Sequence, residues 1–300
     1  MGIAQRKEKG FYMQYIMLTI SALLLAVNFA LNKVYQGIKG TSPATGFGFS
    51  SLSGLFTAVV FFVINGFKLN FSWYSVIMAT LLSSLIISYT LVGFRLLKSG
   101  TMTMYTLFLM TGGMIVPYVF GLLFLNEPFS WIRTLALILI IGGVILSNFN
   151  REKINLKQIM MCVIVFVLNG MVSVVSKLHQ IENTYIAVTA TEFVLIDGIT
   201  RFIIAGILYL VTKNREEHAT QKCIAKPAII IAFSAVIGGV SYLLQLFGAA
   251  TLPATILYPF ITGGSIVLSS LVGVIVFKEK LSVNLIASVV ICFIGTVMFL

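Results

Sequence analysis

Residues 103–146, TMYTLFLMTGGMIVPYVFGLLFLNEPFSWIRTLALILIIGGVIL, recur in weaker form at residues 255–298, TILYPFITGGSIVLSSLVGVIVFKEKLSVNLIASVVICFIGTVM. The two copies share identical residues at one constant offset: Thr103 and Thr255, Gly112 and Gly264, Gly121 and Gly273, Glu127 and Glu279, Ser130 and Ser282, and Gly143 and Gly295. We therefore predict that the chain contains an internal duplication.

The composition places this duplication in a lipid bilayer. Hydrophobic residues make up 59% of the 300 residues, charged residues only 10%, and the mean hydropathy is +1.04. Soluble domains carry about 25% charged residues. Apolar runs of roughly 20 residues predict helical spans, because a helix satisfies its own backbone hydrogen bonds in hydrocarbon. We expect an all-α, multi-pass integral protein of the cell membrane.

Ten spans fit between the polar breaks. We predict them at about residues 12–34, 44–66, 73–97, 101–125, 131–149, 155–177, 186–212, 227–249, 252–277 and 282–300. An odd number of spans per copy reverses the second copy in the membrane. The prediction is thus two inverted five-helix repeats, residues 1–150 and 151–300, an architecture known among secondary transporters.

The segments LNEPFSWIRTLALILIIGGVIL (125–146) and FKEKLSVNLIASVVICFIGTVMF (277–299) allow a comparison with a known family. Each places a Glu after one span and a Ser before the next, and they resemble the EamA-type repeats of the drug/metabolite transporter superfamily. The resemblance covers essentially the whole chain. It implies ten helices, a central cavity between the halves, and movement of a small polar metabolite, commonly outward. The chain departs from the usual pattern, because its second span has no basic residue and its seventh carries Glu192, Asp197 and Arg201.

Polar side chains inside the spans follow helical spacing and predict a substrate pathway. Amides and tyrosines are large for a tight helix interface and costly in lipid, so a water-filled cavity suits them better. The predicted substrate-binding residues are Asn28, Asn32, Tyr89, Thr106, Asn169, Ser173, Tyr242, Gln245, Tyr258 and Thr262. Close helix packing is the alternative role for the Gly and Ser positions, and anchoring at the membrane interface is the alternative for tyrosines.

Three ionisable residues lie in the predicted seventh span. Asp197 and Arg201 are four residues apart, which predicts a structural ion pair. Glu192 has no such partner in its own helix. If it faces the cavity, burial would raise its pKa and let it bind a proton or a cationic substrate. If it lies at the wet end of the span, it is merely solvated.

Two lysines occupy matching places in the short echo ALNKVYQ (30–36) and VVSKLHQ (174–180). In an inverted repeat, Lys33 and Lys177 would lie near opposite membrane faces. We expect them to extend to the headgroups, with gating of anionic groups as the alternative role.

The sequence contains no pattern that indicates an enzyme. Cys162, Cys223 and Cys292 are scattered, neither histidine falls in a metal-binding pattern, and a glycine-rich phosphate loop is absent. We therefore expect no catalytic residues, metal or other cofactor. The net charge of +11 lies mostly at span ends, where it suits anionic lipid headgroups better than nucleic acid. The sequence does not decide whether the protein is a monomer or a homodimer.

Two signals disagree about orientation. The resemblance and the basic residues Arg6, Lys7 and Lys9 favour a cytoplasmic N-terminus, whereas the positive-inside rule favours the opposite. Most loop lysines and arginines, among them Arg151, Lys153 and Lys213 to Lys226, would otherwise lie outside. The chain stops at Leu300 inside an apolar span, so the sequence leaves open whether a natural tail follows this residue.

The function predicted from these features is secondary transport of an amino acid or amine-bearing metabolite by alternating access, in the export direction. A transporter of a nucleoside or sugar conjugate is the nearest alternative. A membrane scaffold that transports nothing is the alternative from another class.

Overall fold

The computed structural model describes residues 2–40, 42–98, 102–147, 155–213, 225–278 and 282–300. Its regular structure is ten α-helices: α1 (Gly2–Lys39), α2 (Pro43–Ile64), α3 (Trp73–Lys98), α4 (Met102–Phe124), α5 (Trp131–Ser147), α6 (Leu156–Ile181), α7 (Ala190–Lys213), α8 (Ala225–Thr251), α9 (Ala254–Phe277) and α10 (Val283–Val297). The predicted all-helical class and the predicted order of ten elements are confirmed for the described residues.

Eight of these helices are long and apolar enough to cross a membrane. The helices α5 and α10 are apolar but shorter, with 17 and 15 residues. Ten full-length spans were predicted, and eight of the ten helices have the required length. The predicted boundaries differ most at three helices, because α1 runs from Gly2 to Lys39, α6 continues to Ile181 and α7 begins at Ala190.

Local sequence signals explain where several helices begin. Ser42 accepts a hydrogen bond from the Thr45 amide before Pro43, the first residue of α2. Asn155 and Gln158 form a reciprocal capping box at α6. Ser282 accepts from the Leu285 amide at the start of α10. These caps satisfy amides that the first helical turn leaves without partners.

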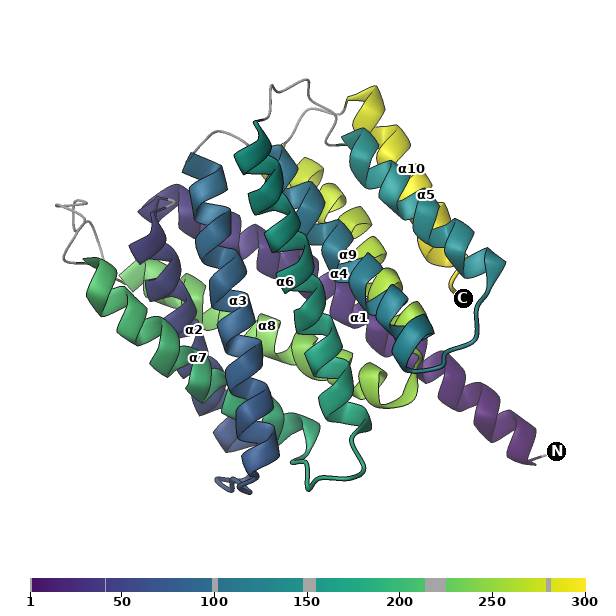
Figure 1. Cartoon of the computed structure of the whole chain (residues 1–300), viewed down its shortest axis with the longest axis horizontal. Helices are drawn as coiled ribbons and strands as arrows, with labels where there is room; N and C mark the ends of the chain where they lie inside the picture. Colours follow the sequence, from purple (N-terminus) through teal and green to yellow (C-terminus); the bar gives the residue numbers. More distant parts are fainter. Residues whose placement is uncertain (1, 41, 99–101, 148–154, 214–224, 279–281) are drawn as a thin grey trace.

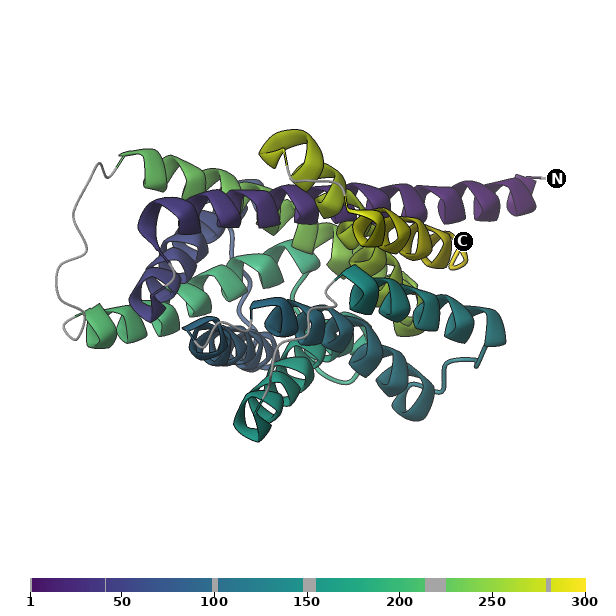
Figure 2. The same cartoon turned by 90° about the horizontal axis from the view of Figure 1, so that it is seen from above.

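The helices form a bundle with paired edges (Figures 1 and 2). The helix α2 packs against α7 at one edge, and α5 packs against α10 at the opposite edge. Between these edges, α3 and α6 lie on one side and α1 and α8 on the other, as the view from above shows. Further contacts join α4 to α6, α1 to α9 and α4 to α9. Segments from both halves of the chain therefore meet throughout the bundle.

Glycines permit the closest of these approaches. A Cβ on Gly54 of α2 would lie 2.7 Å from the Gly198 carbonyl oxygen of α7, and one on Gly198 would lie 2.9 Å from the Gly54 oxygen. A Cβ on Gly112 of α4 would meet the Phe166 carbonyl oxygen at 2.2 Å. Any larger side chain would separate these backbones, which is why small residues mark helix contacts in membranes.

Candidate functional site

A cavity of about 750 Å³ lies inside the bundle. At one end of the bundle it reaches the C-terminal turns of α1 and the start of α2, where Gln36, Gly40, Thr45 and Gly46 line it. We call this opening the mouth. At its inner end the cavity is lined by Ser173 of α6, Tyr242 and Gln245 of α8, and Tyr258 of α9. The volume is within the range of about 300–1,000 Å³ found for small-molecule sites.

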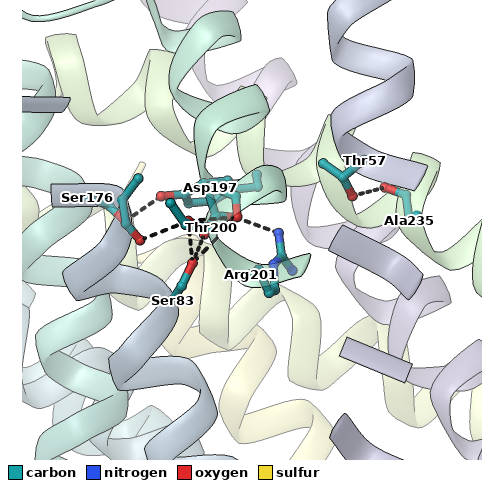
Figure 3. Close-up of polar contacts among 9 residues, drawn as sticks. Thr57, Ser83, Ser176, Asp197, Thr200, Arg201 and Ala235 are labelled. Carbon is teal, nitrogen blue, oxygen red and sulfur yellow. Dashed lines mark hydrogen bonds and ion pairs between the residues drawn. The ribbon is translucent and has the colours of Figure 1, made fainter. Parts of the chain in front are cut away.

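An acidic and a basic side chain meet in the cavity wall (Figure 3). Arg201 Nη2 donates to Asp197 Oδ2 at 2.5 Å, one turn earlier in α7. The other oxygen of Asp197 accepts from Ser83 Oγ of α3 at 3.0 Å, and Ser83 also contacts the Thr200 hydroxyl. Asp197 is 1% exposed and the Arg201 side chain 21% exposed. The predicted ion pair is thus present, and both of its members line the cavity.

A polar network joins α1 to α8 along another wall. Ser21 and Ser241 exchange hydrogen bonds, each hydroxyl donating to the other residue's carbonyl oxygen at 2.9 Å. Ser234 Oγ donates to Asn28 Oδ1 at 2.9 Å, and the Ser234 carbonyl oxygen accepts from Asn28 Nδ2 at 3.3 Å. Gln245 Nε2 donates to Ser241 Oγ at 3.3 Å. The amide side chains in this wall are therefore partly paired within the protein.

Tyrosine hydroxyls close the inner end of the cavity. Tyr258 of α9 donates to the Ser173 carbonyl oxygen of α6 at 2.6 Å, and the Tyr242 hydroxyl contacts Ser176 Oγ at 2.9 Å. These contacts link α6, α8 and α9 at the level where the open volume stops. We call the end of the bundle opposite the mouth the closed end.

The junction between α8 and α9 lies at the closed end, and two charged residues hold it. Lys177 of α6 donates from Nζ to the carbonyl oxygens of Ala249 at 2.7 Å and Leu252 at 2.6 Å. Glu127 accepts from the backbone amides of Ala254 at 2.6 Å and Thr255 at 2.8 Å. A cation thus binds the C-terminal end of α8 and an anion binds the N-terminal end of α9, as the helix dipoles favour. We call these four hydrogen bonds the junction clamp.

The end of α4 directs Glu127 to this position. Asn126 has a φ of 53°, in the left-handed region that Asn tolerates, and the Glu127 amide donates back to the Gly121 carbonyl oxygen. The carboxylate then lies over Gly121, where a Cβ would be 2.7 Å from Glu127 Oε2. Gly121 and Glu127 are both part of the repeated motif, so the turn explains why these residue types occur there.

Glu192 does not line the cavity. Together with Thr189 it forms a capping box at the start of α7: Glu192 Oε2 accepts from the Thr189 amide at 3.0 Å, and Thr189 Oγ1 accepts from the Glu192 amide at 3.4 Å. Its other oxygen accepts from the backbone and side-chain nitrogens of Asn70 at 3.2 and 2.7 Å. The expectation of a cavity carboxyl with a raised pKa is wrong in its location, and at 5% exposure the solvated alternative is wrong too. Glu192 joins the α2–α3 loop to α7.

A buried histidine adds to the contacts at the closed end. The His179 ring stacks between Tyr74 and Phe193, and its Nε2 contacts Ser75 Oγ at 2.9 Å. Gln180 Nε2 lies 2.9 Å from its Nδ1. In the adjoining α6–α7 loop, the Thr184 amide donates to Glu182 and holds the pKa of that carboxyl below its usual value.

The cavity brings together seven of the ten residues predicted to bind substrate. They are Asn28, Asn32, Tyr89, Ser173, Tyr242, Gln245 and Tyr258. Lys33 lies on the exposed surface of α1 and lines the cavity near the mouth. Their contact with a substrate stays a prediction. The side chain of Thr106 is outside the described residues.

Three other predicted placements need correction. Asn169 does not line the cavity, because its Nδ2 donates to the Leu109 carbonyl oxygen at 2.7 Å and so joins α6 to α4. Thr262 lies on α9 between the lining residues Tyr258 and Ser269 but does not line the cavity. Lys177 does not extend to the headgroups, because at 6% exposure its ammonium group is bound to helix carbonyls.

Neither the junction clamp nor the capping box was predicted from the sequence. The Thr189-x-x-Glu192 spacing before an apolar run is a recognisable capping signal. The pairing of Lys177 with the end of α8 has no local signal, because the two groups are 72 residues apart. Among the described residues, no group of three or more His, Cys, Asp or Glu side chains could hold a metal ion.

Comparison with known proteins identifies the fold alone. Neither a family model nor a curated protein matches the sequence. A solved crystal structure of a protein aligns with 94% of this chain and 94% of its own, with a TM-score of 0.75 and 14% sequence identity. At this identity the likeness extends to the arrangement of the helices and not to the activity.

Proposed function

We propose that this protein is a secondary transporter that moves a small polar metabolite by alternating access. The observation that carries the proposal is a cavity of about 750 Å³ that opens at one end of a membrane bundle and is closed at the other. Hydrogen bonds between helices seal that other end, including the junction clamp and the contact of Tyr258 with Ser173. A site open to one side at a time is the requirement for alternating access.

The packing supports a duplicated origin, with inverted repeats over residues 1–150 and 151–300. Gly143 of α5 packs against Ser288 and Cys292 of α10, while Gly295 of α10 packs against Ala136 and Ile140 of α5. These two sets of contacts are equivalent at the same offset that relates the sequence motifs. Likewise, the helices α2, α4 and α5 each pack against the helix five places later in the chain. A twofold relation between the halves accounts for both observations.

We place the mouth in the cytoplasm. Among the described residues, the mouth side has the larger number of lysines and arginines at or near helix ends, namely Lys39, Arg95, Lys98, Lys157, Lys213, Lys226 and Lys278. The closed end and the N-terminus have fewer: Arg6, Lys7, Lys9, Lys68 and Arg133. The positive-inside rule then makes the mouth cytoplasmic, the reverse of the orientation implied by the family resemblance. Substrate would enter from the cytoplasm, which fits export.

The transport proposal is tested by flux into liposomes that contain the purified protein. We expect saturable movement of one or more radiolabelled solutes from a panel of amino acids, amines, nucleosides and sugar conjugates. Ser50→Trp places an indole ring in the cavity and should abolish this flux, whereas Thr80→Trp places the same ring on the exposed surface of α3 and should preserve it. A panel without any protein-dependent flux would favour the scaffold alternative.

A further inference from the structure

Arg201 has more hydrogen-bonding capacity than its surroundings use. A guanidinium group carries five N–H donors. The described residues provide Arg201 with one hydrogen-bond acceptor, the Asp197 carboxylate, and leave its buried Nε without one. Buried charged groups normally have their donors satisfied, so this arrangement calls for a further acceptor. Figure 3 shows the guanidinium beside Asp197, and Arg201 is one of the residues that line the cavity.

The neighbouring groups hold Arg201 in place and do not compete for its remaining donors. Asp197 receives one hydrogen bond from Arg201 and one from Ser83, so the carboxylate is anchored to both α3 and α7. The amides across the cavity are partly paired, because Asn28 exchanges hydrogen bonds with Ser234 and Gln245 donates to Ser241. Among the described residues that line the inner part of the cavity, Arg201 is therefore the charged group with unused donors.

The shape of a guanidinium selects its partner. Its planar fork matches the two oxygens of a carboxylate, or those of a phosphate, in a bidentate contact that an ammonium group cannot make. Much of the remaining wall is apolar, with side chains such as Leu25, Phe29, Phe49, Leu82, Ile86 and Met110. A ligand that satisfies both features has an anionic head and an apolar body. Arg201 is the single arginine among the described lining residues, and Lys33 lies nearer the mouth, so the inner part of the cavity favours one carboxylate over a doubly charged phosphate.

We propose that Arg201 binds the carboxylate of a substrate with an apolar body, and that Asp197 and Ser83 position the guanidinium for this contact. This inference rests on the proposed function and narrows it to a substrate class. The carboxylate is the required group, and an amino group is not. Amines without a carboxylate and uncharged nucleosides are excluded as substrates.

The test measures binding to the purified full-length protein by calorimetry, with probes that differ in one group. These are 3-phenylpropanoate, phenylalanine, phenylalaninamide, phenethylamine and phenyl phosphate. We expect the two carboxylates to bind, and the amide and the amine to bind at least about tenfold more weakly, since a hydrogen bond to a charged group contributes about 1.5–3 kcal/mol. Equal affinity for phenylalanine and its amide would overturn the inference, as would binding of phenyl phosphate alone.

Variants then assign the effect to Arg201. The double variant D197N/R201Q removes both charges and should reduce carboxylate affinity by about tenfold or more. Arg133→Gln is the matched control, because Arg133 lies on α5 and does not line the cavity. If the double variant does not fold, Arg201→Lys keeps the charge but loses the fork and should weaken carboxylate binding as well. Unchanged affinity in a folded variant of either kind would overturn the inference.

Failure of this inference is distinguishable from failure of the proposed function. If liposomes transport amides or amines as fast as carboxylates, the substrate class is wrong and the transport proposal stands. If wild-type liposomes transport nothing in the panel, the transport proposal itself fails.

Discussion

At the scale of single residues, charge and volume decide what this bundle tolerates. Asp197 is almost fully buried, and its carboxylate depends on Arg201 and Ser83 for partners. Removing one member of a buried ion pair leaves an uncompensated charge, whereas replacing both members by neutral groups does not. The consequences of a substitution here therefore depend on the partner as well as on the residue replaced.

We expect Arg201→Ala to destabilise the protein more than the double variant D197N/R201Q. The loss for the single variant should be about 3–5 kcal/mol, the penalty for breaking a buried pair in soluble proteins. The measurement is unfolding of purified protein in detergent, followed by heat or denaturant. Equal stability of the single and double variants would show that Asp197 does not need its partner.

Glycine positions provide a second prediction at this scale. Gly54→Ala places a Cβ at 2.7 Å from the Gly198 oxygen and 2.8 Å from the Phe202 nitrogen, so α2 and α7 must separate. Overpacking of this kind costs about 1–3 kcal/mol and should lower the melting temperature. Gly142→Ala is the control, because no atom lies within 4 Å of the Cβ that it adds. Similar melting temperatures for the two variants would contradict the close packing of α2 and α7.

At the scale of elements, the helix ends at the closed end are held by side chains from other helices. Lys177 binds the end of α8, Glu127 binds the start of α9, and Glu192 binds both the start of α7 and the α2–α3 loop. Each contact satisfies backbone groups that a helix terminus leaves unpaired. If the protein works by the proposed alternating access, these residues would hold the closed end shut.

We expect Lys177→Met to loosen the closed end. Thr255→Cys is the reporter, because Thr255 is 1% exposed and its Oγ1 has no hydrogen-bond partner among the described residues. Loss of the hydrogen bonds from a charged donor should shift the balance toward the open form by about 1.5–3 kcal/mol, or roughly 10- to 150-fold in labelling rate by a maleimide. The background variant lacks the three native cysteines.

Lys157→Met is the control for this experiment. Lys157 lies in the first turn of α6, is exposed, and is not part of the junction clamp. It should leave the labelling rate of Thr255→Cys unchanged. If Lys177→Met labels at the same rate as this control, the junction clamp does not hold the closed end.

At the scale of the whole molecule, the cavity and the distribution of charge together predict an orientation. A cysteine at Thr45, which lines the mouth, should react with a membrane-impermeant maleimide from the cytoplasmic side. A cysteine at Ile186, which is 86% exposed in the α6–α7 loop, should react from the opposite side. Inside-out and right-side-out vesicles of the cysteine-free variant provide the comparison. The reversed pattern would place the mouth outside the cell.

Much of the candidate site was accessible from the sequence because helical spacing is a local property. Side chains three or four residues apart share a face, so Asn28, Asn32, Tyr242 and Gln245 could be assigned to the interior from their neighbours alone. The same argument failed for Asn169 and Thr262, and it could not place Glu192, for which a cavity and the wet end of the span were both open. A polar side chain can satisfy its hydrogen bonds at a backbone carbonyl or a helix end as well as in a cavity, and local spacing does not distinguish these partners.

The sequence by itself determined that this protein is a helical membrane bundle, because composition and run length depend only on the order of residues along the chain. It also determined the positions of the repeated glycines and of Glu127. Only the tertiary structure decided that Lys177 and Glu127 meet at one helix junction, that Arg201 faces the cavity, and that the cavity opens at the end of α1. Such features join residues far apart in the chain, and their energies depend on distances that exist only once the helices have packed.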